Sequence, residues 1–347
     1  MALDTTHENG TTKNCDRISS TERSVQKYLT SFLLEEQPHH PLPADNGRGM
    51  RESFDREFCC GTSQSLYCKE CCRLLVPTHS LPVPVSRRKK SISEGLNLPF
   101  NLHIILDDRR GSATGLHAVA LLDEDECIET DVTDDNPANH MNEVKLIDLA
   151  RGDEMPKYQH MDEATTTFFL FPSPGESIPL ESVASKVETL IVLDCKWTKR
   201  GMIRKSEDLS SLQKVHISSP PQESYYWRWH NAGKGMLSTI EAIFYAAFEV
   251  SQQKLLESNP TLEMNSNDNE LTQDRNNLIH LLWLFGHQRA ATFNAAHNEG
   301  VPAPCSDEGK AMQRALRKQK GTWRQLRHKE DEIRLREKNG LKETKDG

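Results

Sequence analysis

The chain has 347 residues, of which 36% are hydrophobic, and its mean hydropathy is −0.67. This length accommodates one enzyme domain with appended segments, because so polar a composition cannot pack into a core throughout. The formal net charge of −8 excludes a uniformly basic nucleic-acid binder. No apolar run reaches the roughly 18 residues of a membrane span, and residues 1–16 lack a secretory apolar stretch. We expect a nuclear or cytosolic protein that does not engage a membrane.

Two polar regions come first. Residues 1–50 predict a mostly disordered leader with one short amphipathic helix over Val25–Leu34. Residues 51–80 hold five of the nine cysteines within fourteen residues, and a reducing compartment favours metal ligands over disulfides there. The candidate zinc ligands are Cys59, Cys60, Cys68 and Cys71, with Cys72 as the alternative to Cys59. The other interpretation is that these are small buried apolar side chains without a metal.

Residues 81–300 have the texture of an α/β domain. Short apolar runs suited to buried parallel strands recur there: Asn101–Leu106, Ala118–Leu122, Thr167–Phe171 and Leu190–Leu193, with Gln213–Ile217 as a further candidate. Loops rich in Gly, Pro, Asp or Ser usually follow these runs, and ligands bind at the carboxyl ends of open α/β sheets. We therefore predict a mostly parallel sheet with flanking helices and a site in the loops that follow the strands.

Two helices and two basic tracts complete the pattern. A capping box at Ser238 and Glu241 predicts a helix that runs to about Ser251, and a second apolar helix is predicted from Asn276 to about His297. Residues 301–347 form a basic, charged helical tail, in which residues 310–347 carry thirteen Lys or Arg against six Asp or Glu. This tail and Arg87–Lys90 can bind RNA phosphates or act as nuclear import signals, and solvated helix faces explain them equally well.

Three loops place polar or aromatic clusters at the ends of these elements. Prolines stiffen the loop Phe171-Pro-Ser-Pro-Gly-Glu176, and its glycine lets the backbone approach a ligand. Asp194-Cys-Lys-Trp197 ends a buried strand in a carboxylate. Tyr225-Tyr-Trp-Arg-Trp-His230 leads to a helix N-terminus, which favours a carboxylate or phosphate. None of these loops names a reaction alone.

Together and in this order, the motifs resemble DTW-domain proteins, tRNA-uridine aminocarboxypropyltransferases that use S-adenosylmethionine, and specifically the first eukaryotic DTW-domain branch. The resemblance covers about Phe58 to Val250. It rests on the C-x7-C-x2-C spacing of Cys60, Cys68 and Cys71, the loop with Thr114 and His117, the F-P-x-P turn, and Y-W-R-x-H…L-S-T-I-E-A-I over residues 226–243. The family signature D-x-T-W differs here, because Lys196 stands in place of Thr. The first Cys of the opening C-x-x-C falls at Glu57.

The resemblance implies transfer of the 3-amino-3-carboxypropyl group of S-adenosylmethionine to N3 of a tRNA uridine, which forms acp3U. It implies catalytic roles for Asp194, as the base, and for Trp197, which would stack on a ring. From the residues alone, a turn cap is the favoured interpretation of the first and a core residue that of the second, and the resemblance reverses the order for Asp194. The implied cofactor-binding residues are Phe171, Pro172, Ser173, Pro174, Gly175, Leu237, Ser238, Thr239 and Glu241. Contacts to RNA or to the cofactor carboxylate would come from Arg228, His230 and Lys196.

The implied fold is related to the knotted SPOUT-like S-adenosylmethionine transferases, preceded by a small zinc knuckle. Two alternatives stay open. A SPOUT-like RNA methyltransferase would use the same pocket to move a methyl group, and a non-catalytic zinc-knuckle RNA-binding protein would retain the fold without turnover. The lysine in the signature is the feature that favours the second alternative.

Overall fold

The computed structural model describes residues 21–33, 66–75, 96–122, 142–158, 165–196, 206–221, 223–227, 236–258 and 277–302, and six positions between 308 and 318. The chain divides into two compact units. The first, residues 1–224 and 232–288, contains the sheet, and the second is residues 225–231 and 289–347. Among the described residues, no helix is both long and apolar enough to span a membrane.

A parallel sheet forms the centre of the first unit, as the sequence predicts. In the described part of the chain its strand order is β2-β1-β5-β3-β6-β4, and every pairing is parallel. The strands are β1 (Asn101–Leu106), β2 (Val144–Asp148), β3 (Thr167–Leu170), β4 (Ser177–Pro179), β5 (Thr189–Asp194) and β6 (Lys214–His216). Proline is tolerated in β4 because this strand lies at the edge of the sheet.

Four of the five predicted strand runs are strands in the structure. The prediction for Ala118–Leu122 is wrong, because these residues belong to the helix α2 (Leu116–Leu122), of which six residues are buried. A short apolar run fits a buried helix as well as a buried strand, so periodicity alone could not decide. The strands β2 and β4 were not predicted; the first carries a lysine and an aspartate among its five residues, and the second has only three residues.

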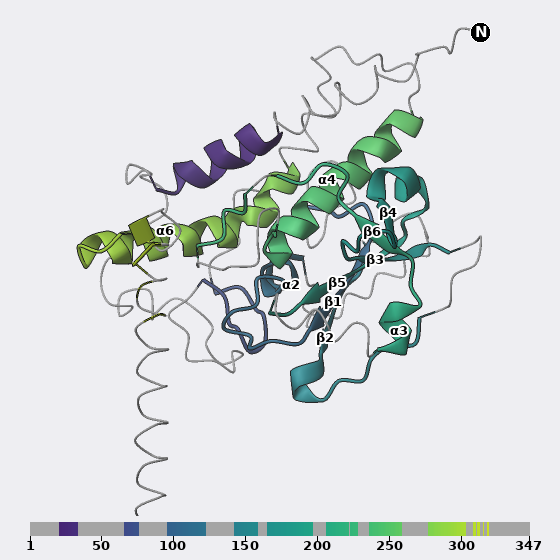
Figure 1. The fold of residues 1–347 in the computed structure, drawn as a ribbon, viewed down its shortest axis with the longest axis horizontal. Coiled ribbons are helices and arrows are strands. Elements are labelled where there is room, and N and C mark those ends of the chain that lie inside the picture. The colour runs from purple at the N-terminus through teal and green to yellow at the C-terminus, as the bar shows by residue number, and fades with distance from the viewer. Residues whose placement is uncertain are drawn as a thin grey trace, which may run out of the picture. The chain divides into compact units, whose positions relative to one another are not determined.

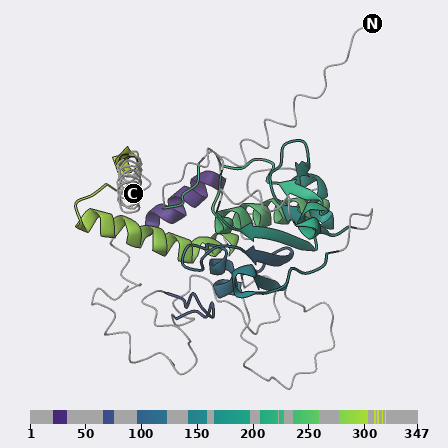
Figure 2. The same ribbon diagram turned by 60° about the horizontal axis from the view of Figure 1, so that its bottom comes forward.

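Helices cover both faces of the sheet (Figures 1 and 2). The long helix α4 (Thr239–Ser258) contacts β5 and η6 (Leu180–Lys186), and α2 contacts β2. Both α2 and α4 contact η8 (Ile279–Leu282), which α6 (Trp283–Asn298) follows. The predicted start of α4 is confirmed, although the helix extends beyond Ser251. The opposite face meets α3 (Glu207–Ser210), and η5 (Leu149–Arg151) follows β2.

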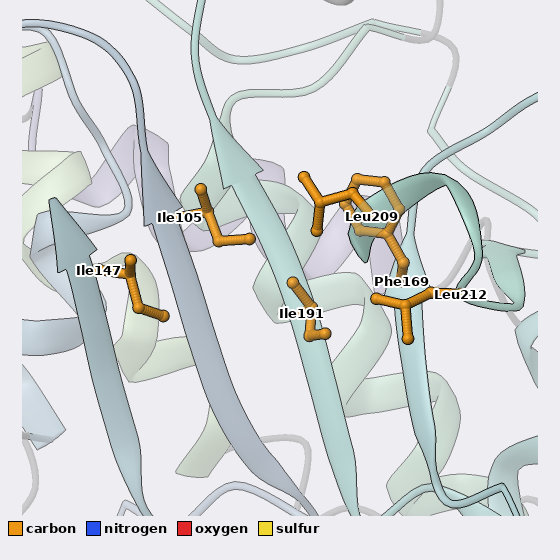
Figure 3. Packing of buried hydrophobic residues seen from close by; sticks show 6 residues of the cluster. All are labelled: Ile105, Ile147, Phe169, Ile191, Leu209 and Leu212. Atoms are coloured by element: carbon orange, nitrogen blue, oxygen red, sulfur yellow. The ribbon is translucent and has the colours of Figure 1, made fainter. Parts of the chain in front are cut away.

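The face of the sheet that meets α3 carries a cluster of buried apolar side chains (Figure 3). Neighbouring strands place their side chains in register, so that Ile105 lies opposite Ile147 and Phe169 opposite Ile191. Leu209 of α3 and the following Leu212 close over them, and all six side chains are buried. Burying these side chains contributes on the order of 2 kcal/mol each, which fixes the positions of β1, β2, β3 and β5.

A helix from the leader packs against η8 and the start of α6. Residues 21–31 are helical, in agreement with the predicted amphipathic helix, and Val25 and Leu29 are buried. The Tyr28 hydroxyl lies 3.0 Å from Nδ1 of His280, and the ring of Phe32 meets the edge of His287 at a centroid distance of 4.8 Å. The remainder of the leader lies outside the described residues.

Candidate active site

Two buried aspartates lie at the carboxyl edge of the sheet, on the face that α2 and α4 cover. Leu106, the last residue of β1, pairs in register with both Asp148 of β2 and Asp194 of β5. In-register neighbours point to the same face, so the two carboxylates flank the end of β1. Asp148 is 2% exposed and Asp194 is 6% exposed. Buried carboxylates need charge partners or hydrogen-bond donors, and each of these two finds different ones.

Asp194 is held by hydrogen bonds from neutral groups. The Gly115 amide donates to its Oδ2 at 2.6 Å, and the Thr239 side chain and the Thr114 backbone also hydrogen-bond to it. Burial raises the pKa of this carboxyl from 3.8 to about 6; the nearby Asp108 charge adds to the rise, and the hydrogen bonds oppose it. A carboxylate with such a pKa is a stronger proton acceptor than an exposed one and is still mostly ionised at pH 7.

Gly115 brings the backbone close enough to make this hydrogen bond. A Cβ added there would lie 2.8 Å from Asp194 Oδ2 and 3.1 Å from Cγ2 of Ile104. It would also lie 3.3 Å from Cγ2 of Thr239. Because β1, β5 and α4 all meet at this point, no single neighbour can move aside easily, and only a residue without a side chain can occupy the position.

The N-terminus of α4 is bonded to its surroundings. Glu241 is fully buried, and its Oε2 accepts from the Ser238 amide at 2.9 Å and from the Ser238 and Ser224 hydroxyls at 2.6 Å each. The reach-back half of the predicted capping box is therefore present. The Ile240 amide donates to Oγ1 of Thr114 at 3.3 Å, so the loop before α2 caps this helix from outside. These bonds fix α4 beside Asp194.

The predicted cofactor turn follows β3, which pairs with β5, so it lies at the same sheet edge as Asp194. The amides of Glu176 and Ser177 both donate to the Ser173 carbonyl at 3.0 Å. Gly175 has a φ of +78°, which favours glycine, and an added Cβ there would meet nothing within 4 Å. The Phe171 ring stacks on Phe169 at 5.5 Å with an interplanar angle of 9°. This turn is stiff and has open space beside its glycine.

Lys196 stands beside Asp194 and pairs with a second acid. Its Nζ lies 3.7 Å from Oδ1 of Asp108, and its side chain is 56% exposed. Asp108 also accepts from the Ser112 hydroxyl at 3.2 Å and from the Arg109 amide at 2.7 Å. The lysine thus adds a positive charge next to Asp108, whose own charge raises the pKa of Asp194.

A family model for the DTW domain matches residues 105–288, more than half of the chain. The matched range contains Asp194, Gly115 and the N-terminus of α4. The chain belongs to the DTW-domain family. Among solved structures, it is similar to the SAM-dependent rRNA:acp-transferase Tsr3 from Vulcanisaeta distributa, with 15% identity and a TM-score of 0.27 over 62% of this chain and 97% of that chain. A search of curated proteins gives no match.

The cysteine hairpin, residues 66–75, precedes the matched DTW range. Tyr67 and Leu74 form an antiparallel bridge, and the Cys68 amide donates to the Arg73 carbonyl at 2.8 Å. Cys68 is buried and Cys71 is exposed, whereas Cys72 is buried with a φ of +59°. Within the described ranges, no group of three or more His, Cys, Asp or Glu is placed to hold a metal ion, and Cys59 and Cys60 lie outside those ranges. Zinc therefore stays a prediction.

The remaining predicted site residues of the DTW domain are placed only in part. Trp197, Arg228 and His230 lie outside the described residues. His117 is buried, its Nε2 lies 3.1 Å from Oε1 of Gln288, and burial lowers its pKa to about 3, so it is neutral at pH 7. Its ring meets the edge of Tyr67.

The sequence argument missed Gly115, Asp108 and the carboxylate of Asp148. Two of these had a signal. Asp108 follows a predicted strand at the ligand-binding edge, and Gly115 stands within the Thr114 and His117 loop that carried the family resemblance. Asp148 gave none, because β2 itself was not predicted.

Proposed function

We propose that this DTW-domain protein transfers the 3-amino-3-carboxypropyl group of S-adenosylmethionine to N3 of a tRNA uridine. Family membership supports this proposal, and the observation that carries it is Asp194. This residue is a buried carboxylate of raised pKa at the ligand-binding edge of a parallel sheet, in the first position of the family signature.

The residues at this edge suit S-adenosylmethionine chemically. The donor is a cation with an adenine ring and an amino-acid end, so it needs acidic groups, an apolar or aromatic surface and polar backbone. Asp194 and Asp108 supply the acidic groups, and the turn from Phe171 to Gly175 supplies open backbone beside its glycine. We propose that this turn and residues 237–241 hold the donor, with Leu237 as an apolar wall. When bound, S-adenosylmethionine supplies the electrophilic carbon next to its sulfonium.

The protein's part in the reaction is to place uridine and to accept a proton. The bond from N3 to carbon forms as the carbon–sulfur bond breaks, methylthioadenosine leaves, and the N3 proton goes to the Asp194 carboxylate. Gly115 and Thr239 hold that carboxylate in one orientation, which lowers the entropic cost of reaching the reactive geometry. General-base assistance of this kind contributes about 10²- to 10⁴-fold in rate.

Contacts to the substrates are assigned by charge and ring type. We propose that Arg228, His230 and Lys196 contact RNA phosphate or the donor carboxylate, and that Trp197 stacks on uracil or adenine. Of these residues, Lys196 lies within the described part of the chain, where its ammonium pairs with Asp108. Because its side chain is largely exposed, the ammonium can contact an anion as well.

A structural zinc ion in the cysteine-rich segment is part of the proposal. The hairpin supplies Cys68 and Cys71 from one tight turn, as the ends of a C-x-x-C do in zinc knuckles. Cys59 and Cys60 would complete a tetrahedral site. Metal analysis of purified protein should give one zinc per chain, and the Cys68→Ser and Cys71→Ser variants should lose it. An equal zinc content in the variants would remove zinc from the proposal.

Nuclear residence is the proposed location, with the cytoplasm as a second one. The basic tracts at Arg87–Lys90 and in residues 310–347 are the features that import receptors read. A fluorescent fusion with both tracts should concentrate in the nucleus, and neutralising each tract separately should show which one is required. Uniform distribution of the intact fusion would contradict this location.

The direct test is product analysis. Purified protein is incubated with S-adenosylmethionine and unmodified tRNA transcripts, which are then digested to nucleosides and weighed by mass spectrometry. We expect acp3U together with methylthioadenosine, both lost in an Asp194→Asn variant that keeps the shape of the side chain. A methylated nucleoside with S-adenosylhomocysteine would assign a methyltransferase, and tight tRNA binding without product would assign an RNA-binding protein.

A further inference from the structure

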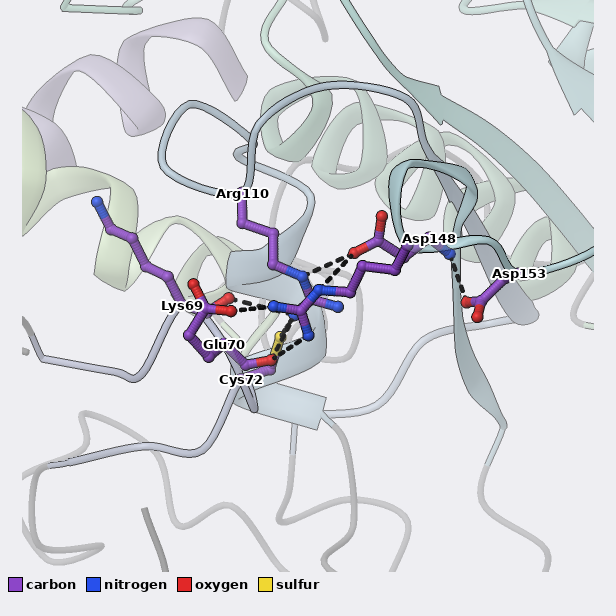
Figure 4. A network of polar contacts seen from close by, with 7 residues as sticks. Lys69, Glu70, Cys72, Arg110, Asp148 and Asp153 are labelled. Atoms are coloured by element: carbon purple, nitrogen blue, oxygen red, sulfur yellow. Dashed lines mark hydrogen bonds and ion pairs between the residues drawn. The ribbon is translucent and has the colours of Figure 1, made fainter. Parts of the chain in front are cut away.

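Arg110 connects three parts of the chain that are distant in sequence (Figure 4). Its Nε donates to Oδ2 of Asp148 at 2.7 Å, which ties it to the end of β2. Its Nη1 donates to the carbonyls of Glu70 and Lys69 at 2.7 and 3.2 Å, and to Sγ of Cys72 at 3.7 Å, which ties it to the cysteine hairpin. Arg110 itself lies on the loop between β1 and α2, five residues before Gly115.

The network around Arg110 pairs two arginines with two carboxylates. Asp148 also lies 3.6 Å from Nε of Arg151, and Arg151 forms an ion pair with Glu70. The side chain of Arg110 is only 14% exposed, so its bonds to a carboxylate and two carbonyls are worth more than those of a surface pair. A guanidinium can serve several acceptors in one plane, whereas a lysine ammonium carries the same charge as a single point.

The loop from Asp107 to Gly115 is therefore anchored at both ends to the two buried aspartates of the sheet edge. Near its start, Arg110 binds Asp148; at its end, the Gly115 amide binds Asp194. The steric contacts of Gly115 leave little freedom for that amide, so the path of the loop decides whether it reaches the carboxylate. The cysteine hairpin meets this loop at the acceptors that Arg110 contacts, and its Tyr67 meets His117 just after Gly115.

We propose that Arg110 is a positioning residue, which fastens the loop to the cysteine hairpin and to β2 and so holds the Gly115 amide against Asp194. The effect on acp transfer rests on the proposed function, whereas the effect on the Gly115 amide does not. A consequence is that the hairpin influences the proposed reaction through the acceptors that it offers to Arg110. Rearranging the turn at Lys69 to Cys72 would move the acceptors of Arg110 and with them the loop.

Arg110→Lys is the decisive variant. It keeps the positive charge that Asp148 requires but removes the planar guanidinium, which binds several acceptors at once. The matched control is Arg109→Lys, at an exposed neighbouring position on the same loop. Selective ¹⁵N-glycine labelling reports the Gly115 amide directly. We expect its hydrogen exchange to rise at least about fivefold in Arg110→Lys and to stay unchanged in the control. Circular dichroism melting checks that both variants are folded.

Kinetics give a second, independent readout. In Arg110→Lys, kcat for acp transfer should fall about 10- to 100-fold with little change in KM for tRNA, because small misplacements of a catalytic group have effects of that size. The midpoint of the pH–rate profile should rise, since the Gly115 bond lowers the pKa of Asp194. The titratable groups that interact electrostatically with Asp194, Asp108 with its partner Lys196 and Tyr67 of the hairpin, are the same in Arg110→Lys and Arg109→Lys.

The outcomes are distinguishable. An unchanged Gly115 amide in a folded Arg110→Lys variant would overturn the positioning role, whatever the activity. If the Gly115 amide changes in Arg110→Lys while the wild-type protein makes no acp3U, the positioning role is supported and the proposed function is rejected. If Arg110→Lys does not fold, the pair Arg110→Gln with Asp148→Asn removes both charges and avoids a buried unpaired carboxylate. An unchanged Gly115 amide in that folded pair would overturn the proposal equally.

Discussion

The two faces of the sheet differ in the polarity of the side chains that they bury, although the same strands form both. On the face toward α3, Ile105 lies in register with Ile147 and Ile191 with Phe169, and this apolar cluster buries no charge. On the face toward α2 and α4, the last residues of β2 and β5 are the buried aspartates 148 and 194. The first face stabilises the fold, and the second buries a carboxylate at a cost in stability, at the place where the proposed reaction needs a base. Substitutions on the two faces should therefore have separable effects.

The largest effect is expected for Asp194→Asn. The asparagine can still accept from the Gly115 amide, but it cannot take a proton, so acp transfer should fall about 10²- to 10⁴-fold. In the wild type, the rate should rise with pH and level off above a midpoint near 6, where the carboxyl ionises. Single-turnover rates across pH 5 to 8 measure both. A variant that retains wild-type rates would remove Asp194 from catalysis.

The same substitution should increase stability. The pKa of Asp194 is higher in the folded protein, about 6, than its ordinary value of 3.8, so the folded state holds this proton more tightly. Stability should therefore fall as pH rises through that window and stay level above it. Asp194→Asn removes this term, which amounts to at most about 3 kcal/mol. Urea unfolding at pH 4.5 and pH 7.5 should show the variant gaining more on the wild type at the higher pH than at the lower one.

Ile191→Ala tests the apolar face. The substitution leaves a cavity among the buried side chains of β1, β3 and α3, and should lower the free energy of unfolding by about 2 to 5 kcal/mol. The pH–rate profile of the folded variant should keep its wild-type midpoint, because the Ile191 side chain points away from Asp194. Urea unfolding and the pH–rate profile, compared below the melting temperature, check this. A shifted midpoint would show that the two faces are coupled.

Gly115→Ala places a methyl group at the contact between the sheet edge and α4. With Asp194 Oδ2 at 2.8 Å from the new Cβ, either the carboxylate or the loop must move, so the transfer rate should fall about 10- to 100-fold. Gly111→Ala is the matched control on the same loop, since a Cβ there meets nothing within 4 Å. Equal rates in the two variants would mean that the Gly115 contact can relax without consequence.

The sequence predicted the elements of the candidate site better than their geometry. The strand that ends at Asp194, the turn after Phe171 and the start of α4 were predicted, because strand ends and capping boxes leave local signals. The partners of Asp194 come from elsewhere, and only the pairing of β1 with β5 brings Gly115 within 2.6 Å of it. The pairing of two strands that are distant in sequence cannot be predicted from the hydrophobic periodicity of either one. Likewise, α2 was mistaken for a strand, because its apolar residues are buried on all sides.

The smallest effect is expected for Lys196→Thr, which restores the family signature. The ammonium lies 3.7 Å from Asp108 and is largely exposed, so solvent and salt screen it, and the rate should change less than about threefold. The direction is set by Asp108, whose charge raises the pKa of Asp194 and would no longer be offset. The pH midpoint should therefore move up, and Asp108→Asn should move it down.

Salt separates this screening effect from direct binding. At 1 M salt the Debye length is about 3 Å, so the difference in midpoint between wild type and Lys196→Thr should shrink if the lysine acts by screening Asp108. If Lys196 instead binds an RNA phosphate, the variant should raise KM for tRNA and reduce its salt dependence while the midpoint stays in place. Only the first result would mean that the lysine adjusts the base and that the signature tolerates it for that reason.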